Sequence, residues 1–136
     1  MNKALAMFSA LIFVCALVAA CGKKKPSLDM SAVNAGVAAM GSQLPMHLGV
    51  DLTLMKASVV GDQAEFEYSS PYPSKVQVPP RATGLMRGSM LQYACGNATA
   101  RSILNAGATI NHRVIDAEGH ELFATTGDLA ACDIYK

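Results

Sequence analysis

Apolar residues recur at spacings of three and four between residues 30 and 44, which is the pattern of one buried stripe on a helix. Ser27 and Asp29 offer N-cap oxygens just before this stripe, and Pro45 ends it. The segment is rich in Ala and Gly, so its intrinsic helix propensity is low. We therefore predict an amphipathic helix that packing must stabilise. The stripe consists of Met30, Val33, Val37, Met40 and Leu44.

Residues 50–69 alternate between apolar and polar on both sides of Gly61-Asp62, which favours a hairpin with a two-residue turn. This turn makes one face of the hairpin apolar and the other polar, with Lys56 opposite Glu67. We predict two antiparallel strands in that register. The opposed pairs are Val60 and Gln63, Val59 and Ala64, Ser58 and Glu65, Ala57 and Phe66, Lys56 and Glu67, and Met55 and Tyr68.

Residues 69–82 contain four prolines, so they cannot form a central strand. We predict an extended loop there, with a short edge strand at 76–78. The apolar residues between 85 and 95 favour a second helix that is interrupted near Gly96. Asn97 can cap a third helix over 98–106, and Gly107 can adopt the left-handed conformation that ends it.

From residue 108 the period changes from helical to extended, and Asp116-Ala117-Glu118-Gly119 is a turn sequence. It predicts strands over 108–115 and 120–126, followed by a short turn or helix over 128–132. The order α-β-β-α-α-β-β indicates an α+β fold with two layers. It would be a single domain with an antiparallel sheet of about four to five strands and helices on one face.

The start of the chain has a different pattern. A nearly unbroken apolar run over residues 4–20 follows Lys3, and Val18-Ala19-Ala20 ends it directly before Cys21. A transmembrane helix is the alternative, but about 17 apolar residues are short for a span that needs roughly 20. We predict a lipoprotein signal peptide over 1–20, with Cys21 as the acylated first residue of the mature chain, carrying palmitate or similar acyl chains.

Residues 21–26 then form the acylated cysteine and a polar, Lys-rich tether, and 27–136 form the folded domain. Asp directly after the cysteine is the residue that commonly retains lipoproteins in the inner membrane of double-membrane bacteria. Gly22 stands there instead, which predicts an outer-membrane anchor with the domain in the periplasm.

The charge of the domain excludes one class of partner. Apart from the tether lysines, the mature chain has seven Lys or Arg and ten Asp or Glu, a net charge of −3. Nucleic-acid binding needs a concentrated basic face, so no nucleic-acid partner is expected.

Cys95 and Cys132 remain in a compartment where disulfides persist. A bond between them would close a loop of about 38 residues and stabilise the fold by roughly 4 kcal/mol. A metal pair or a redox couple is the alternative, but there is no Cys-x-x-Cys and no His at ligand spacing. A structural disulfide is the preferred interpretation.

The candidates for catalysis are three histidines and one pair of carboxylates. If Ile115 faces His120 across the second turn, His112 faces Phe123, so the two imidazoles are out of register for a shared metal. His47 has the ordinary position of a solvated loop histidine. No metal, no cofactor and no catalytic residue is predicted from them.

Glu65 and Glu67 lie on one face of a strand, about 7 Å apart, within the range of hydrolase carboxylate pairs. A solvated strand face with Lys56 and Ser58 as neighbours explains them better. No nucleophile elbow or Gly-rich phosphate loop accompanies them. We therefore predict a protein that is not an enzyme.

Met86, Met90 and Tyr93 fall at i, i+4 and i+7, a stripe of adaptable side chains that could line a groove for a partner segment. Core packing explains the same spacing and is the preferred reading. These three residues are the candidates for partner binding.

The second half of the chain carries structural motifs in a characteristic order: Ala94-Cys95, Arg101, Ile103-Leu104, Gly107, the strand 109–115, the turn 116–119, Leu122 and Cys132. This order resembles the C-terminal half of a family of small exported α+β proteins. The family includes a quorum-sensing-regulated virulence-factor group and is similar to the α/β class of type II secretion pilotins. The first helix, Leu44-Pro45 and the hairpin fit as well, so the resemblance spans about residues 27–132.

Pilotins are lipoproteins that bind the C-terminal segment of a secretin and bring it to the outer membrane. The resemblance therefore implies a secretin segment as partner, and a disulfide between Cys95 and Cys132. The same fold also occurs in members to which that role is not assigned, and a fold alone does not determine function.

The resulting hypothesis is a non-enzymatic, periplasm-facing outer-membrane lipoprotein that binds another protein, as an amphipathic helix or an added strand beside its helices. The alternative is a module that binds a small ligand or a lipid in an apolar pocket. A hydrolase would require His47 or His112 to share one cleft with Glu65 and Glu67.

Overall fold

The structure, a computed structural model, describes residues 25–49, 51–73 and 77–135. Its elements in chain order are α1 (Met30–Gly41), β1 (Met46–Gly49), β2 (Leu52–Val60), β3 (Gln63–Ser69), α2 (Pro80–Gly96), α3 (Ala98–Asn105), β4 (Ile110–Ile115), β5 (Glu121–Gly127) and the 3-10 helix η1 (Ala130–Tyr135). The predicted signal peptide, Cys21 and the first tether lysines lie outside the described residues.

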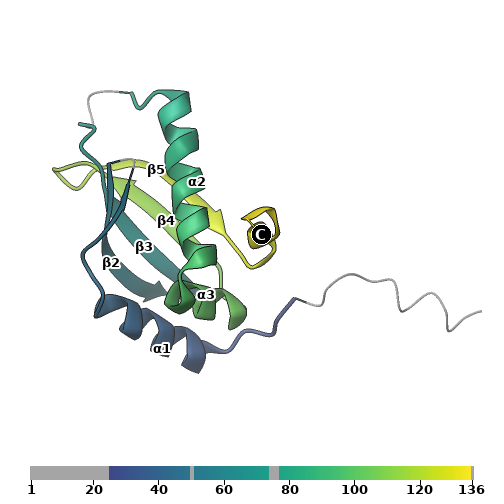
Figure 1. Ribbon diagram of the computed structural model, residues 1–136. Helices are drawn as coiled ribbons and strands as arrows, with labels where there is room; N and C mark the ends of the chain where they lie inside the picture. The colour runs from purple at the N-terminus through teal and green to yellow at the C-terminus, as the bar shows by residue number, and fades with distance from the viewer. Residues whose placement is uncertain (1–24, 50, 74–76, 136) are drawn as a thin grey trace, which may run out of the picture.

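One five-stranded sheet holds all the strands, in the order β1-β2-β3-β4-β5. Figure 1 shows α2 running along one side of this sheet, with α1 across its lower end. The α+β fold and its two layers are as predicted. The sheet is mixed rather than antiparallel, however, because β3 and β4 run parallel and α2 and α3 form the crossover between them.

Helix α1 begins where predicted, since the Asp29 carboxylate accepts hydrogen bonds from the backbone N–H groups of Ser31 and Ala32. It ends at Gly41, four residues before Pro45. A Cβ built on Gly36 would stand 2.7 Å from Ile103 Cγ1, so the missing side chain lets α1 approach α3 closely. The stripe residues Val33, Val37 and Met40 are buried.

The first hairpin has the predicted register next to its turn, from Val60 opposite Gln63 to Lys56 opposite Glu67. The prediction that Met55 lies opposite Tyr68 is wrong. A β-bulge at Met55 inserts one residue, so Leu54 lies opposite Tyr68 and Met55 is 48% exposed. The bulge thereby moves Leu54 and Leu52 to the buried face.

The predicted loop over 69–82 is too long, because α2 starts at Pro80. Proline fits the first turn of a helix, where its missing N–H has no intrahelical partner. Gln77 and Val78 belong to no strand, which contradicts the described part of the predicted edge strand at 76–78. Asn97 caps α3 through Thr99 and Ala100 as predicted.

The second hairpin forms, but in a shifted register. Ile115 lies opposite Glu121 instead of His120, and His112 lies opposite Thr125 instead of Phe123. The pairing is displaced by one residue at Ile115, and a bulge between Val114 and Ile115 adds a second, so the partner of His112 lies two residues further along β5 than predicted. Beyond β5, a disulfide joins Cys95 near the end of α2 to Cys132 in η1, with a Cα–Cα distance of 5.4 Å.

The core lies between the sheet and the helices. Among the described residues, no helix combines the length and the apolarity that crossing a bilayer requires. The largest fully buried side chains include Tyr68, Phe66, Met40, Leu52, Leu54, Met86, Met90, Ile103 and His112.

Candidate functional site

An open groove of about 440 Å³ lies between strand β1 and helix α2. Strand β1 supplies His47 and Leu48. Helix α2 supplies Ser89, Gln92 and Gly96, whose spacing of three and four places them on one side of the helix. The groove therefore has an extended element on one side and a helix on the other. The full lining is His47, Leu48, Ser89, Gln92, Tyr93, Gly96 and Asn97.

Strand β1 is the edge of the sheet on this side, and within the described ranges no strand pairs with its outer edge. An edge strand presents backbone N–H and C=O groups to any extended segment that approaches it. The groove thus combines side-chain contacts from α2 with backbone hydrogen-bonding groups from β1. The His47 Nδ1 lies 2.8 Å from the Thr53 hydroxyl, which orients this imidazole at the edge.

A second open hollow, of about 510 Å³, lies on the other side of His47. It is formed where β1, β2 and β3 reach the same end of the sheet, and Ala117 of the second turn also lines it. His47 therefore separates two concave surfaces. The lining is His47, Gly49, Asp51, Leu52, Thr53, Ser69, Ser70, Pro71 and Ala117.

The three side chains predicted for partner binding occupy different environments. Met86 and Met90 lie in the core, with exposed fractions of 2% and 0%, as the core-packing interpretation of their spacing expects. Tyr93 is only partly buried and lines the groove. Its hydroxyl donates to Met40 Sδ at 3.3 Å, and partial burial raises its pKa. Of the three, Tyr93 is positioned to touch a partner in the groove.

The predicted carboxylate pair belongs to an ion-pair cluster on the sheet face opposite the core. Arg113 Nη1 lies 3.2 Å from Glu65 and 3.5 Å from Glu67, and its Nε donates to Glu121 at 2.9 Å. Hydrogen bonds to Glu121 and Glu65 raise the pKa of the Arg113 guanidinium. Both carboxylates of the pair are therefore occupied by a cation that the sequence analysis did not place beside them.

The histidines do not complete a hydrolase site with these carboxylates. Successive side chains of a strand point to opposite faces, and the cross-strand partners of Glu65 and Glu67 are Asn111 and Arg113. His112 lies between those two positions and points into the core. His47 lies on the edge strand, two strands away from β3. The geometry required for the hydrolase alternative is absent among these residues.

His112 is fully buried, which the sequence analysis did not predict. Its Nδ1 lies 2.8 Å from the Tyr68 hydroxyl, and its Nε2 has no hydrogen-bond partner. The ring stacks on Tyr68 at a centroid distance of 5.7 Å and meets Phe66 edge-on. Burial lowers the pKa of His112 to about 4, so the imidazole is neutral at physiological pH.

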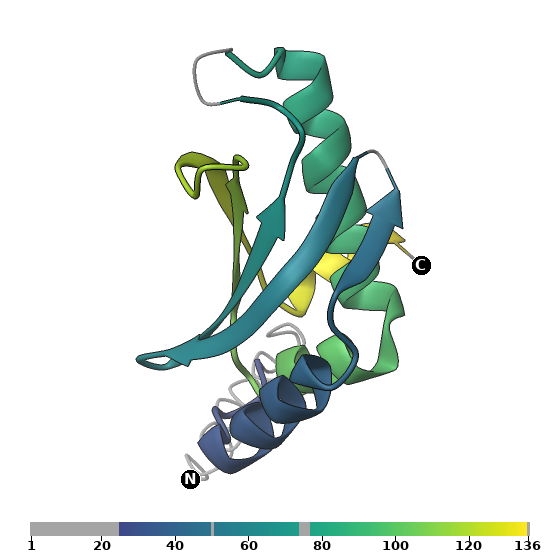
Figure 2. The same cartoon turned by 90° about the vertical axis from the view of Figure 1, so that its left-hand side faces the viewer.

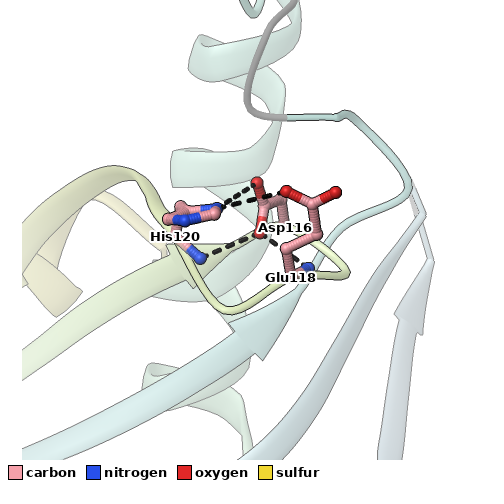
Figure 3. A group of neighbouring side chains, drawn as sticks. All are labelled: Asp116, Glu118 and His120. Carbon is pink, nitrogen blue, oxygen red and sulfur yellow. Dashed lines mark hydrogen bonds and ion pairs between the residues drawn. The ribbon is translucent and has the colours of Figure 1, made fainter.

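Asp116, Glu118 and His120 are turned toward one another at the second turn (Figure 3). One oxygen from each carboxylate and a ring nitrogen lie within 4.8 Å of one another, so the group could hold a cation. The Asp116 carboxylate, however, already accepts hydrogen bonds from the backbone N–H groups of Glu118 and His120, both at 2.8 Å. These hydrogen bonds stabilise the turn, and the turn itself brings the three side chains together.

The groove residues Ser89, Gln92 and Gly96 were missed in the sequence. They form a line of small and polar residues beside Met86 and Met90 on the same helix. This line was the one feature of the sequence that could have indicated a groove along α2. Their importance depends on β1, a short strand that the sequence analysis did not separate from the preceding loop.

Comparisons with known proteins give structural matches only. No protein-family model matches the sequence, and no curated protein does. The fold is similar to that of the pilotin EpsS from the Vibrio vulnificus type 2 secretion system, with a TM-score of 0.57 and 19% identity. That match covers 76% of this chain and 89% of EpsS.

The type II secretion system pilotin AspS from Vibrio cholerae matches with a TM-score of 0.58 and 18% identity, over 76% of this chain and 90% of AspS. A Pseudomonas aeruginosa protein described as secreted matches with a TM-score of 0.58 and 16% identity. It is covered over 90% of its length, and this chain over 75%. The chain therefore shares the fold of two pilotins and of a protein without that description.

Proposed function

We propose that this protein is a non-enzymatic accessory lipoprotein of the pilotin type, which binds the C-terminal segment of a secretin and brings it to the outer membrane. The observation that supports this most is the shared fold, which extends over 89% and 90% of two pilotins of type II secretion. The features of the N-terminal sequence that predict acylation at Cys21 supply the address that such a function needs.

In this proposal the parts of the chain have separate tasks. The acyl chains on Cys21 hold the protein in the outer membrane, with the domain in the periplasm. The groove between β1 and α2 takes the secretin segment, which contacts Tyr93 and Gln92 and the edge of β1. In this proposal the groove between β1 and α2 only binds the partner, and no catalytic residue and no cofactor takes part.

Deletion of the gene in its own host tests the proposal. Secretin multimers should be lost from the outer membrane and appear in the inner-membrane fraction, as measured by density-gradient fractionation and immunoblotting. The wild-type gene should restore them. If every secretin of the host remains correctly localised without the protein, the proposal is wrong.

Two matched variants locate the binding surface. Gln92→Arg places a long cation in the groove, whereas Ala38→Arg places the same side chain on the exposed side of α1. We expect Gln92→Arg to lower copurification of the secretin segment at least tenfold, about 1.4 kcal/mol, and Ala38→Arg to bind normally. Equal binding by both variants would exclude the groove.

The small-ligand alternative gains no support from the geometry. Both hollows are open surface grooves rather than enclosed chambers, while ligand pockets bury most of their ligand.

A further inference from the structure

The chain enters the domain as a strap that is packed against the turn between α3 and β4. A Cβ built on Gly107 would stand 2.8 Å from the carbonyl oxygens of both Pro26 and Ser27. The Asp29 N–H also donates to the Ala106 carbonyl at 2.8 Å. Residues 26–29 are therefore held against the domain, so the chain joins the domain at Pro26.

The tip of the first hairpin lies at the same end of the molecule as this strap. The Ala64 N–H, one residue after the tip, donates to the Thr109 carbonyl at 3.0 Å, and Thr109 follows the Gly107 turn closely. Figure 2 shows α1 at the bottom of the molecule and the tip of the β2–β3 hairpin to its upper left, in the lower half of the view. We call the strap, the Gly107 turn and the hairpin tip 60–63 the strap end.

The tether is short compared with the domain. Four residues separate Cys21 from Pro26, so even a fully extended chain spans at most about 18 Å between them. A domain of about 100 residues has a radius of gyration of about 13 Å and hence a diameter of about 35 Å. An acyl group on Cys21 would therefore keep the strap end within reach of the bilayer surface.

The strap end also exposes apolar side chains that suit a lipid surface. Val60 at the hairpin tip is 56% exposed, and Leu28 in the strap is 45% exposed. Apolar groups that face a membrane can enter the region between headgroups and acyl chains. The Asp116–His120 turn and the second hollow lie at the opposite end of the sheet.

We infer that the domain stands on the bilayer with its strap end against the lipid, so that Leu28 and Val60 contact the membrane and the β1/α2 groove opens sideways. The inference rests on the proposed acylation of Cys21. It deepens the proposed function, because a fixed orientation would present the groove to a partner that approaches along the membrane.

Tryptophan fluorescence tests this orientation without background, since the chain contains no Trp. The acylated mature protein carrying Val60→Trp, Leu28→Trp or Leu85→Trp is reconstituted into phosphatidylethanolamine and phosphatidylglycerol vesicles with brominated acyl chains. Leu85 is the matched control, because it is 55% exposed, like Val60, but lies in the first half of α2, away from the strap end. We expect bromolipid to cause loss of emission at positions 60 and 28 but not at 85.

Equal quenching at all three positions, quenching at 85 alone, or none would overturn the inference. Mass spectrometry of Cys21 and vesicle flotation are measured on the same samples. An acylated, floating protein without the expected pattern refutes the orientation alone, whereas an unmodified Cys21 refutes the anchor and the orientation together. A flexible Gly/Ser insert between Lys24 and Lys25 lengthens the tether. It should abolish quenching at position 60, because the strap end is no longer kept at the bilayer, while flotation persists. Unchanged quenching in this variant would also overturn the inference.

Discussion

At the scale of single residues, His112 is the clearest case of a polar group that stabilises the fold only in one protonation state. The neutral imidazole fits between Tyr68 and Phe66, and its Nε2 is buried without a partner. A charged ring would have to lose its hydration at the same place, which is why the pKa of His112 is lowered to about 4.

This lowered pKa predicts a pH dependence of stability. The unfolded chain takes up the His112 proton near pH 6.5, while the folded protein does so only near pH 4. The contribution of His112 to the free energy of unfolding should therefore fall by about 3 kcal/mol as the pH is lowered from 6.5 to 4.

We expect His112→Phe to remove this contribution. At pH 7 the variant should be less stable by about 1–2 kcal/mol, because the Tyr68 hydroxyl loses its partner. The wild-type and variant curves should converge as the pH falls, as measured by urea unfolding. His47→Asn, at an exposed position, is the control and should keep the wild-type profile. Parallel curves for wild type and His112→Phe would contradict the prediction.

Glycine is required at position 107 for two reasons, the backbone conformation and the close approach of the strap, and a variant at Gly119 separates them. Its φ of +86° disfavours any side chain, and its surface is covered by the strap. Gly119 has a similar φ of +88° but no neighbouring atom within 4 Å of a Cβ.

Gly119→Ala should cost about 1–2 kcal/mol of unfolding free energy through backbone conformation alone. Gly107→Ala should cost about 1 kcal/mol more, because the strap and its Asp29 hydrogen bond are displaced. Thermal or urea unfolding measures both. Equal losses in the two variants would show that the strap adds nothing to the stability of the domain.

At the scale of elements, η1 is attached to the rest of the domain by a covalent bond to α2. It is a short 3-10 helix, and such helices have little stability of their own. The disulfide lies beside Gly96 and Asn97, so it also holds the end of α2 that borders the groove.

Replacing both cysteines, Cys95→Ser with Cys132→Ser, should lower the free energy of unfolding by about 2–4 kcal/mol. Equilibrium urea unfolding of the double variant and of the reduced wild type should give the same midpoint. Reductant should leave the double variant unchanged, which serves as the control. A midpoint equal to that of the oxidised wild type would show that the bond does not stabilise the domain.

At the scale of the whole molecule, the proposed function depends on the membrane in which the anchor resides. Gly22→Asp changes the residue that follows the proposed acylation site, outside the described part of the chain. We expect this variant to fold normally and to remain acylated but to fractionate with the inner membrane. Secretin multimers should then be lost from the outer membrane as in the deletion strain. An unchanged distribution of the variant would contradict the predicted address.

Local sequence sufficed where one short segment determines the geometry. The Asn97 cap, the Gly107 turn and the hairpin register from Val60 to Lys56 follow from residues adjacent in the chain, so they were predicted correctly. The bulges at Met55 and after Val114 were not predictable in this way. Each shifts a strand by one residue, and the packing of the whole sheet against the helices decides which residue is inserted.

The sequence by itself determined the α+β class, the sites of the main turns and caps, and the expectation of an anchor at Cys21. The tertiary structure decided the parallel pairing of β3 with β4, the burial of His112, the placement of Arg113 among three carboxylates and the groove between β1 and α2. The physical reason is range. Caps and turns arise from interactions within a few residues, whereas these other features join segments dozens of residues apart, which meet only when the core packs.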